Sequence, residues 1–289
     1  MQQKNLKNFY KIIIPLVAVL LVFLVVIVAL TYKKEKEYRA EQARISESQA
    51  LAEMTTTVTV PEGYTVTQIA QLLEEKNVCS RSDFLEYVKN PPKEVLDKLG
   101  IKDISKKIYA LEGYIFPDTY EFYRNEKPEV VAAKFINNFL VRVTDEMYEK
   151  ANSLGYTMDE IITMASIIQK EAGLIEENAK VASVIYNRLN DGMQIQCDVT
   201  SNYLEKYVKP YVDNFLEDFE NNYDTFKCAA LPSGAICNPG VECIKAALEP
   251  AETDYFFFVT DSEDVTKFYF SKTYDEHISN CHIAGYTGY

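Results

Sequence analysis

The sequence of 289 residues predicts an α+β fold with one N-terminal transmembrane helix, a small α/β module and a larger mixed α+β domain. Three observations predict this class. An uncharged apolar run lies near the N-terminus, a strand pattern and two short helix patterns follow it, and helix and strand patterns then alternate to the C-terminus. The length suffices for one large domain or two modest ones.

The apolar run extends from Ile12 to Leu30. As a helix it spans about 28 Å, close to the ~30 Å hydrocarbon core of a bilayer. The alternatives are a buried core helix and a cleaved signal peptide, but no small-residue cleavage site follows the run. We expect an uncleaved anchor at 12–31. Basic residues flank both ends of the run, and the acid-free tail 1–11 favours the cytoplasm. The remainder is then an extracytoplasmic body on a single-pass cell-membrane protein.

Charge is unevenly distributed along the chain. The net charge is −13, but residues 1–40 carry seven basic and two acidic side chains, a net +5, which leaves −18 for the rest. A body with this much negative charge repels the phosphate backbones of nucleic acids. We therefore expect no nucleic-acid partner. A neutral or sugar-based substrate fits better.

The chain has six cysteines and two histidines, and their number and spacing limit the metal and redox chemistry that it can support. No CxxC motif is present and histidines are few, so we expect no metal site and no cofactor. A disulfide between Cys228 and Cys237 is one interpretation of the cysteines. Burial of all six as free thiols is the other.

The first folded module is expected at 56–110, after a charged helical stalk at 32–55. Thr55–Val60 has a strand pattern. Two helices should follow, the first capped by Thr65 or Thr67 and the second by Ser80 or Ser82.

The larger domain is expected at 111–289. Asp261–Asp264 should form a turn between its two strands. The expected helices are 128–152, 158–172, 177–190 and 241–248, and the expected strands are Tyr255–Val259 and Lys267–Phe270.

Glu171 is the candidate catalytic residue. In a helix it shares a face with Met164, Ile167 and Ile168, so its carboxylate continues an apolar stripe. Desolvation and the negative end of the helix dipole both raise the pKa of a carboxyl group there, as a general acid requires. The alternative is a glutamate that reaches water past Gly173.

Other polar residues are candidates for substrate binding. If 196–200 is extended, Gln196, Asp198 and Thr200 line one face; the alternative is the solvated face of an edge strand. In segment 111–122, aromatic residues alternate with acids, which suits either sugar stacking or core packing. The substrate-binding candidates are Asn187, Gln196, Asp198, Thr200, Glu112, Asp118 and Tyr223.

Five segments in order resemble the YceG-like family of endolytic murein transglycosylases. They are LEGYIFPDTYEF (111–122), MASIIQKEAG (164–173), VASVIYNRLNDGMQIQCDVT (181–200), LPSGAICNPG (231–240) and PAETDYFFFV (250–259). The segment VTVPEGYTVTQIAQLL (58–73) resembles the family's LysM-like region, which makes 56–110 a LysM-like module and 111–289 a YceG-like catalytic domain.

The resemblance implies that Glu171 is the catalytic acid and base. The first glutamate of the family's E-K-E motif is replaced by Gln169, which a helix directs away from Glu171. Val199, Ala230 and Ser233 also depart from the family pattern, which affects the expected loop shape.

The implied reaction is cleavage of the MurNAc–GlcNAc bond within nascent peptidoglycan strands, which leaves 1,6-anhydro-MurNAc ends and terminates glycan elongation. Peptidoglycan synthases of the elongation or division machinery are the implied partners. The alternatives are a muramidase-type hydrolase, with Asp198 or Asp118 as second carboxylate, and a non-catalytic wall-binding scaffold.

Overall fold

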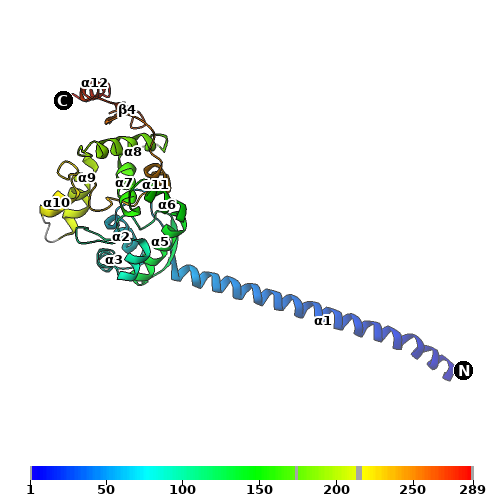
Figure 1. The fold of residues 1–289 in the computed structure, drawn as a ribbon. Coiled ribbons are helices and arrows are strands. Elements are labelled where there is room, and N and C mark those ends of the chain that lie inside the picture. Colours follow the sequence, from blue (N-terminus) through cyan, green and yellow to red (C-terminus); the bar gives the residue numbers. More distant parts are fainter. Residues whose placement is uncertain (1, 173–174, 213–216, 288–289) are drawn as a thin grey trace. The chain divides into compact units, whose positions relative to one another are not determined.

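The computed structural model describes residues 2–172, 175–212 and 217–287. These residues fall into two compact units, one that ends at Thr55 and one that begins at Thr56. The first unit is a single helix, α1 (Gln2–Met54), drawn in blue in Figure 1. The second unit contains all the other helices and both two-stranded sheets.

Helix α1 is continuous through the predicted anchor and the predicted stalk. It is long and apolar enough to cross a membrane, and its apolar window is not buried against any other part of the chain that the structure describes. Leu16–Leu30 therefore form an exposed apolar surface that water would solvate poorly. The helix is a candidate for a single membrane anchor, as the sequence predicted.

The second unit is mixed α and β, which confirms the predicted α+β class. Its α-helices are α2 (Val66–Glu75), α3 (Arg81–Lys89), α4 (Lys93–Leu99), α5 (Pro128–Arg142), α6 (Asp145–Ser153), α7 (Met158–Glu171), α8 (Ile175–Asn190), α9 (Asp198–Tyr203), α10 (Glu217–Tyr223), α11 (Val241–Leu248) and α12 (Tyr274–Ile283). Its strands are β1 (Thr55–Thr59), β2 (Thr119–Tyr123), β3 (Phe257–Thr260) and β4 (Phe268–Ser271), and a π turn at Leu204–Val208 and a 3-10 turn at Lys209–Tyr211 follow α9.

Helices α2 and α3 begin at predicted caps. The Thr65 hydroxyl accepts from the backbone N–H of Gln68, whose side chain in turn accepts from Thr65 N–H. Ser80 accepts from Asp83 N–H at the start of α3. These bonds satisfy helix-terminal N–H groups that would otherwise have no partner.

Segments on both sides of residue 110 share one sheet and one core. Strand β1 pairs with β2, and Val60 N–H donates to the carbonyl of Asp118. Helix α3 packs against α5. One hydrophobic cluster includes Val58, Leu73 and residues of α7, α8 and α11.

The prediction of one helix over 128–152 was wrong, because two helices occupy this range. Helix α5 ends at Arg142, and Val143 is extended. Thr144 then takes the N-cap position of α6, with Asp145 and Glu146 in the first turn. Acidic side chains in a first turn favour a new helix start over continuation of the old one.

Helix α7 lies at the centre of the second unit, packed against α8, α11, α6 and α9 (Figure 1). Its residues are buried from Ile161 to Ile168 without interruption. A helix buried on all sides is typical of a core element. The predicted helix 158–172 is thus confirmed to within one residue, and the expected end at Gly173 lies outside the described residues.

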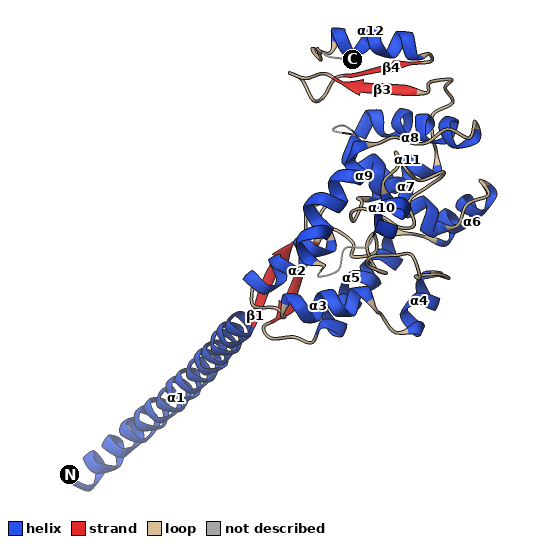
Figure 2. Cartoon of the chain, turned by 90° about the vertical axis from the view of Figure 1, so that its left-hand side faces the viewer, coloured by secondary structure: helices blue, strands red, loops and turns tan. Residues whose placement is uncertain are grey.

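Strands β3 and β4 form an antiparallel hairpin, and α12 packs on it (Figure 2). Phe258 pairs with Phe270, and Val259 pairs with Tyr269. The Asp261 carboxylate accepts backbone N–H bonds in the predicted turn. Both strands begin later than predicted, since Tyr255 and Lys267 lie outside them.

Asn238 joins distant segments in the core. Its side-chain oxygen accepts from the backbone N–H groups of Gly113 and Ile115, at 3.0 and 2.8 Å. Its amide nitrogen donates to the carbonyl of Tyr64 and to the Glu112 carboxylate, both at 2.9 Å. One fully buried side chain therefore fixes the loop 231–240 to the segment 111–115 and to the start of α2.

All six cysteines are buried and free. The proposed Cys228–Cys237 disulfide is not formed. The alternative interpretation, small buried thiols, is the one that the structure supports.

Candidate active site

Glu171 is the last residue of α7. A capping box starts this helix, where the Thr157 hydroxyl accepts from Glu160 N–H and Glu160 accepts from Thr157 N–H. The buried stripe that includes Ile167 and Ile168 sets the rotation of the helix in the core. Rotation and length together bring the carboxylate of Glu171 to a cavity wall.

The two residues before Glu171 are engaged elsewhere. The side-chain oxygen of Gln169 accepts from Gly240 N–H at 2.8 Å. Lys170 Nζ donates to the carbonyl of Gly63 at 3.1 Å. Only Glu171 of these three residues lines the cavity described next.

The Glu171 cavity has a volume of about 520 Å³. This volume lies within the range typical of small-molecule sites. Its walls come from the end of α7, from α8, from the segment 195–198, and from β3 and α12. The lining residues are Glu171, Val184, Arg188, Ile195, Gln196, Cys197, Asp198, Phe226, Phe256, Phe257, Phe258, Val259, Tyr274 and His277.

Burial and a neighbouring charge raise the pKa of Glu171 from 4.5 to about 7. Loss of solvation is the larger cause, because the charged carboxylate is the form that water would stabilise. The negative charge of Asp198 adds to the rise, and a hydrogen bond with the Cys197 thiol opposes it. A carboxyl group with this pKa can both give and take a proton near neutral pH.

Arg188 joins three walls of the cavity. Its Nε donates to the carbonyl of Phe256 at 2.6 Å, and Nη1 donates to the carbonyls of Gln194 and Ile195, both at 3.0 Å. Nη1 also donates to the side-chain oxygen of Gln196 at 3.1 Å. The guanidinium group is buried, so these bonds both satisfy its donors and hold the walls together.

An aromatic wall stands beside Arg188. The guanidinium lies 4.8 Å from the ring centre of Phe257. On α12, the ring of His277 stacks on Phe257, with centroids 5.2 Å apart and an interplanar angle of 22°. Half-buried aromatic rings next to polar groups are suited to binding the apolar faces of sugars.

Two predicted substrate-binding residues lie in this cavity, Gln196 and Asp198. The extended conformation predicted for 196–200 was wrong, however, because α9 begins at Asp198. Gln196 adopts a positive φ of 55° at the turn into this helix. The two side chains reach the same cavity through a turn and a helix start.

Thr200 lies behind the cavity wall and not in it. It is fully buried, and its hydroxyl donates to the carbonyl of Cys197 at 2.7 Å and contacts the Thr225 hydroxyl at 3.0 Å. Thr225 also accepts from Cys197 N–H at 2.9 Å. Thr200 therefore supports Cys197, which contacts Glu171.

Asn187 and Asp118 lie away from Glu171. Asn187 donates to the carbonyls of Thr253 and Tyr255 and lines a separate cavity beside the end of α11. Asp118 forms an ion pair with Arg142 at 2.9 Å. Neither residue lines the Glu171 cavity.

Glu112 and Tyr223 are core residues. The Glu112 carboxylate accepts from Val66 N–H, from Asn238 and from the Tyr203 hydroxyl. Tyr223 is fully buried, and its hydroxyl accepts from Ile108 N–H at 3.1 Å. Neither residue lines the Glu171 cavity.

Sequence reasoning missed Arg188, Cys197 and His277 as cavity residues. One signal was present for Arg188, which follows Val184 by four positions and so shares its helix face. A charged residue on a buried face needs partners, and here they are backbone carbonyls. For His277 no local signal exists, since packing of the C-terminal hairpin brings it to the site.

Comparisons with known proteins show the family to which the chain belongs. The chain matches the YceG-like family over residues 23–282. A similar relative is the endolytic murein transglycosylase of Bacillus subtilis, 33% identical over an alignment of 231 residues that covers 76% of this chain and 62% of the relative. The protein of the same name from Streptococcus pneumoniae is 27% identical over 78% of this chain and 44% of its own length.

A solved structure is also similar. The crystal structure of a yceG-like protein from Listeria monocytogenes superposes with a TM-score of 0.66 at 29% identity, over 78% of this chain and 75% of that one. The chain spans less than two thirds of the length of the curated relatives it matches. Because the family match covers most of the sequence, and includes every wall of the Glu171 cavity, the chain belongs to the YceG-like family.

Proposed function

We propose that this protein is an endolytic lytic transglycosylase that cleaves the MurNAc–GlcNAc bond within nascent peptidoglycan strands. The observation that carries the proposal is the half-buried Glu171 carboxyl, with a pKa near 7, in the wall of a sugar-sized cavity. The names of the Bacillus and Streptococcus relatives support the same activity.

The proposed reaction uses Glu171 twice. Protonated Glu171 gives its proton to the glycosidic oxygen, the C1–O bond breaks, and the leaving GlcNAc receives the proton as a hydroxyl group. Positive charge then develops at C1 of MurNAc. The MurNAc 6-hydroxyl oxygen bonds to C1 and its proton passes to Glu171, which restores the acid and leaves a 1,6-anhydro ring.

Asp198 and the aromatic wall have supporting roles in this proposal. A negative carboxylate near C1 stabilises developing positive charge. Asp198 also keeps Glu171 protonated before the reaction, because its charge raises the pKa of Glu171. Gln196, held by Arg188, would donate to or accept from sugar hydroxyl and acetamido groups.

Membrane anchoring completes the proposal. Helix α1 would hold the catalytic unit at the outer surface of the cell membrane, where new glycan strands are made. The module at 56–110 would act as a LysM-like glycan-holding region before a catalytic domain at 111–289. Peptidoglycan synthases of the elongation or division machinery would be partners.

A muramidase-type hydrolase is the second candidate, and one observation favours it. Asp198 lies in the same cavity as Glu171 and is close enough to shift its pKa. A second carboxylate could activate water for attack at C1. The products then differ from those of the transglycosylase by one water molecule per cleaved bond.

The test is digestion of purified peptidoglycan by the full-length protein in detergent, followed by mass spectrometry of the products. We expect anhydro-MurNAc ends from the unaltered protein. Glu171→Gln should lower the cleavage rate about 10²- to 10⁴-fold, because the amide can neither give nor take the proton. Glu149→Gln, an exposed position on α6, is the matched control and should cleave normally.

Two results would contradict the proposal. Reducing MurNAc ends in place of anhydro ends would assign the protein to the hydrolases. Equal cleavage by the Glu171→Gln and Glu149→Gln proteins would remove Glu171 from the mechanism, and no cleavage by any of the three would favour a non-catalytic scaffold.

A further inference from the structure

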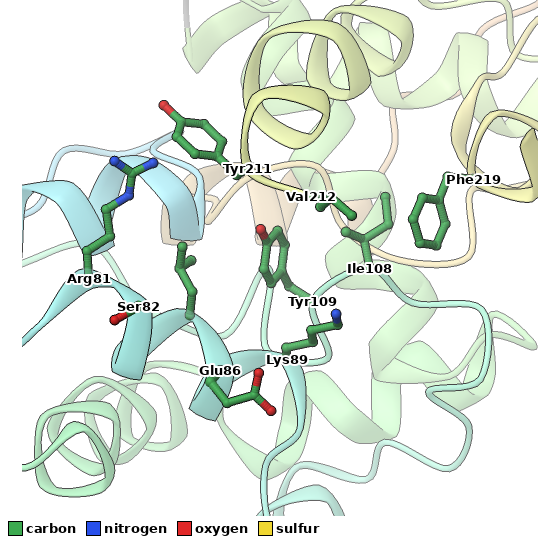
Figure 3. A pocket seen from close by; sticks show the side chains of 10 residues that line it. Arg81, Ser82, Glu86, Lys89, Ile108, Tyr109, Tyr211, Val212 and Phe219 are labelled. Carbon is green, nitrogen blue, oxygen red and sulfur yellow. The ribbon is translucent and has the colours of Figure 1, made fainter. Parts of the chain in front are cut away.

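A second cavity, larger than the Glu171 cavity, lies between α3 and the residues that follow α9 (Figure 3). Its volume is about 670 Å³, and it shares no lining residue with the Glu171 cavity. We call it the α3 cavity and define it by Arg81, Glu86 and Lys89 of α3 together with Tyr109 and Tyr211. None of the reaction steps above uses it.

The Arg81 guanidinium lies over an aromatic ring at the cavity. Its guanidinium carbon lies 4.3 Å from the centre of the Tyr211 ring, and Figure 3 shows the two side chains together at one end of the cavity. An arginine stacked on an aromatic ring keeps the N–H groups of its edge available, and this edge matches the two oxygens of a carboxylate. Among the residues that the structure describes, no acidic side chain forms a salt bridge with Arg81.

Lys89 places a second cation at the opposite end of the same helix, at the cavity. Within the described part of the chain it too has no salt bridge. The surroundings make these cations unusual, because residues 56–289 carry a net charge of −16, the total of −13 less the +3 of residues 1–55. Two cations that form no salt bridge with the acidic residues the structure describes, in one cavity of an acidic unit, favour an anionic ligand.

The other residues that line the cavity favour a peptide over a phosphate polymer as the anionic ligand. Tyr109 and Tyr211 offer ring surface for apolar groups. Glu86 also lines the cavity, and its Oε1 accepts from the Asn90 amide at 2.9 Å. A carboxylate within the cavity disfavours a phosphate polymer, whereas it can accept from the amide or ammonium groups of a peptide that also bears carboxylates.

We propose that the α3 cavity binds the stem peptide of peptidoglycan, with one stem carboxylate on Arg81, another on Lys89, and a stem N–H group on Glu86. The inference rests on the proposed function, because that function supplies peptidoglycan as the substrate. The cavity would then select strands that still carry stem peptides, while Glu171 acts on the glycan at a separate place.

Calorimetric titration of the full-length protein in detergent tests this inference without any cleavage step. The probes are a synthetic stem tetrapeptide with free carboxylates, the same peptide with its carboxylates amidated, glycan strands freed of peptides by an amidase, and inorganic phosphate. Arg81→Gln and Lys89→Gln are the variants. Lys98→Gln, an exposed lysine on neighbouring α4, is the charge-matched control, and circular dichroism confirms the fold of each protein.

We expect the free-carboxylate peptide to bind at least tenfold more tightly than the amidated peptide. Arg81→Gln should weaken this binding about tenfold or more, Lys89→Gln should weaken it less, and Lys98→Gln should leave it unchanged. Higher salt should weaken binding to the unaltered protein. The cleavage of peptide-free glycan should be unaffected by Arg81→Gln, which separates this inference from the role of Glu171.

Several outcomes would overturn the inference. Equal binding of the two peptides would show that no carboxylate is recognised. Equal affinity of the Arg81→Gln and Lys98→Gln proteins would remove the cavity from binding. If phosphate bound more tightly than the free-carboxylate peptide, and did so through Arg81, the cavity would be assigned to a phosphate ligand. If peptide-free glycan bound more tightly than the peptide, and did so through Arg81, the cavity would be assigned to the lactyl carboxylate of the sugar.

Discussion

At the residue scale, the surroundings of the Glu171 carboxyl group determine its pKa, on which the proposed reaction depends. Burial and the charge of Asp198 hold the pKa of Glu171 near 7, and the Cys197 thiol acts in the opposite direction. The acid form that the proposed bond cleavage requires therefore predominates below pH 7 and is lost above it. Two neighbours with opposite effects allow the assignment to be tested in both directions.

Asp198→Asn and Cys197→Val should move the pH profile in opposite directions. Removal of the Asp198 charge lowers the pKa of Glu171, so the fall in kcat/KM at alkaline pH should begin at lower pH. Removal of the thiol hydrogen bond raises the pKa, so the fall should begin at higher pH. Profiles of kcat/KM from pH 4 to pH 9 would measure both. Identical alkaline limbs in all three proteins would mean that a group other than Glu171 titrates.

Glu112 should make stability depend on pH. Burial raises its pKa from 4.5 to about 8, although its hydrogen-bond donors oppose the rise. The folded state therefore holds the proton more tightly than the unfolded state. This contribution is full below pH 4.5 and is lost as the pH rises through 8. The midpoint of thermal unfolding, followed by circular dichroism, should fall over this range less steeply in Glu112→Gln. Equal slopes would contradict the assignment.

At the element scale, the sequence predicted helices better than the segments between them. The stripe in α7 and the caps at Thr65 and Ser80 are local patterns, so they identify helices without knowledge of the fold. The segment 196–200 was mispredicted because its alternating polar residues have tertiary causes. Thr200 pairs with Thr225, and Gln196 is held by Arg188. No local pattern encodes such distant partners.

The site was predictable to a similar extent. Glu171 lies in a periodic helix that ends at the cavity, and Gln196 and Asp198 are near it in sequence. Glu112 and Tyr223 were predicted as binding residues because a sequence does not distinguish a buried polar side chain from an exposed one, and the structure places both in the core. Their burial follows from partners that lie 46 to 126 positions away.

Arg188→Lys should loosen the wall that β3 contributes to the cavity. A lysine cannot reproduce the donors that reach Phe256, Gln194, Ile195 and Gln196 at once. We expect faster hydrogen exchange in the β3–β4 hairpin and kcat/KM at least tenfold lower. The control is Arg142→Lys, because Arg142 pairs with Asp118. It should change neither the hydrogen exchange of the hairpin nor kcat/KM. Unchanged exchange in the hairpin would show that Arg188 does not hold it.

At the scale of the whole molecule, the two units make separable contributions. Helix α1 is a self-contained unit, and the core lies wholly within the second unit. A chain that begins at Thr55 should therefore remain folded and soluble without detergent. It should unfold in one cooperative transition and retain cleavage of soluble glycan, but lose membrane association. Aggregation of this shortened chain, or two unfolding transitions, would contradict the division into units.

Asn238 bears on the chemical lifetime of the protein. Asparagine side chains commonly deamidate when the backbone nitrogen of the next residue attacks the amide carbon to form a cyclic imide. Here the next residue is Pro239, whose nitrogen carries no hydrogen and cannot complete that ring closure. The amide that connects the loop 231–240 to two other segments is thus protected from this route of deamidation.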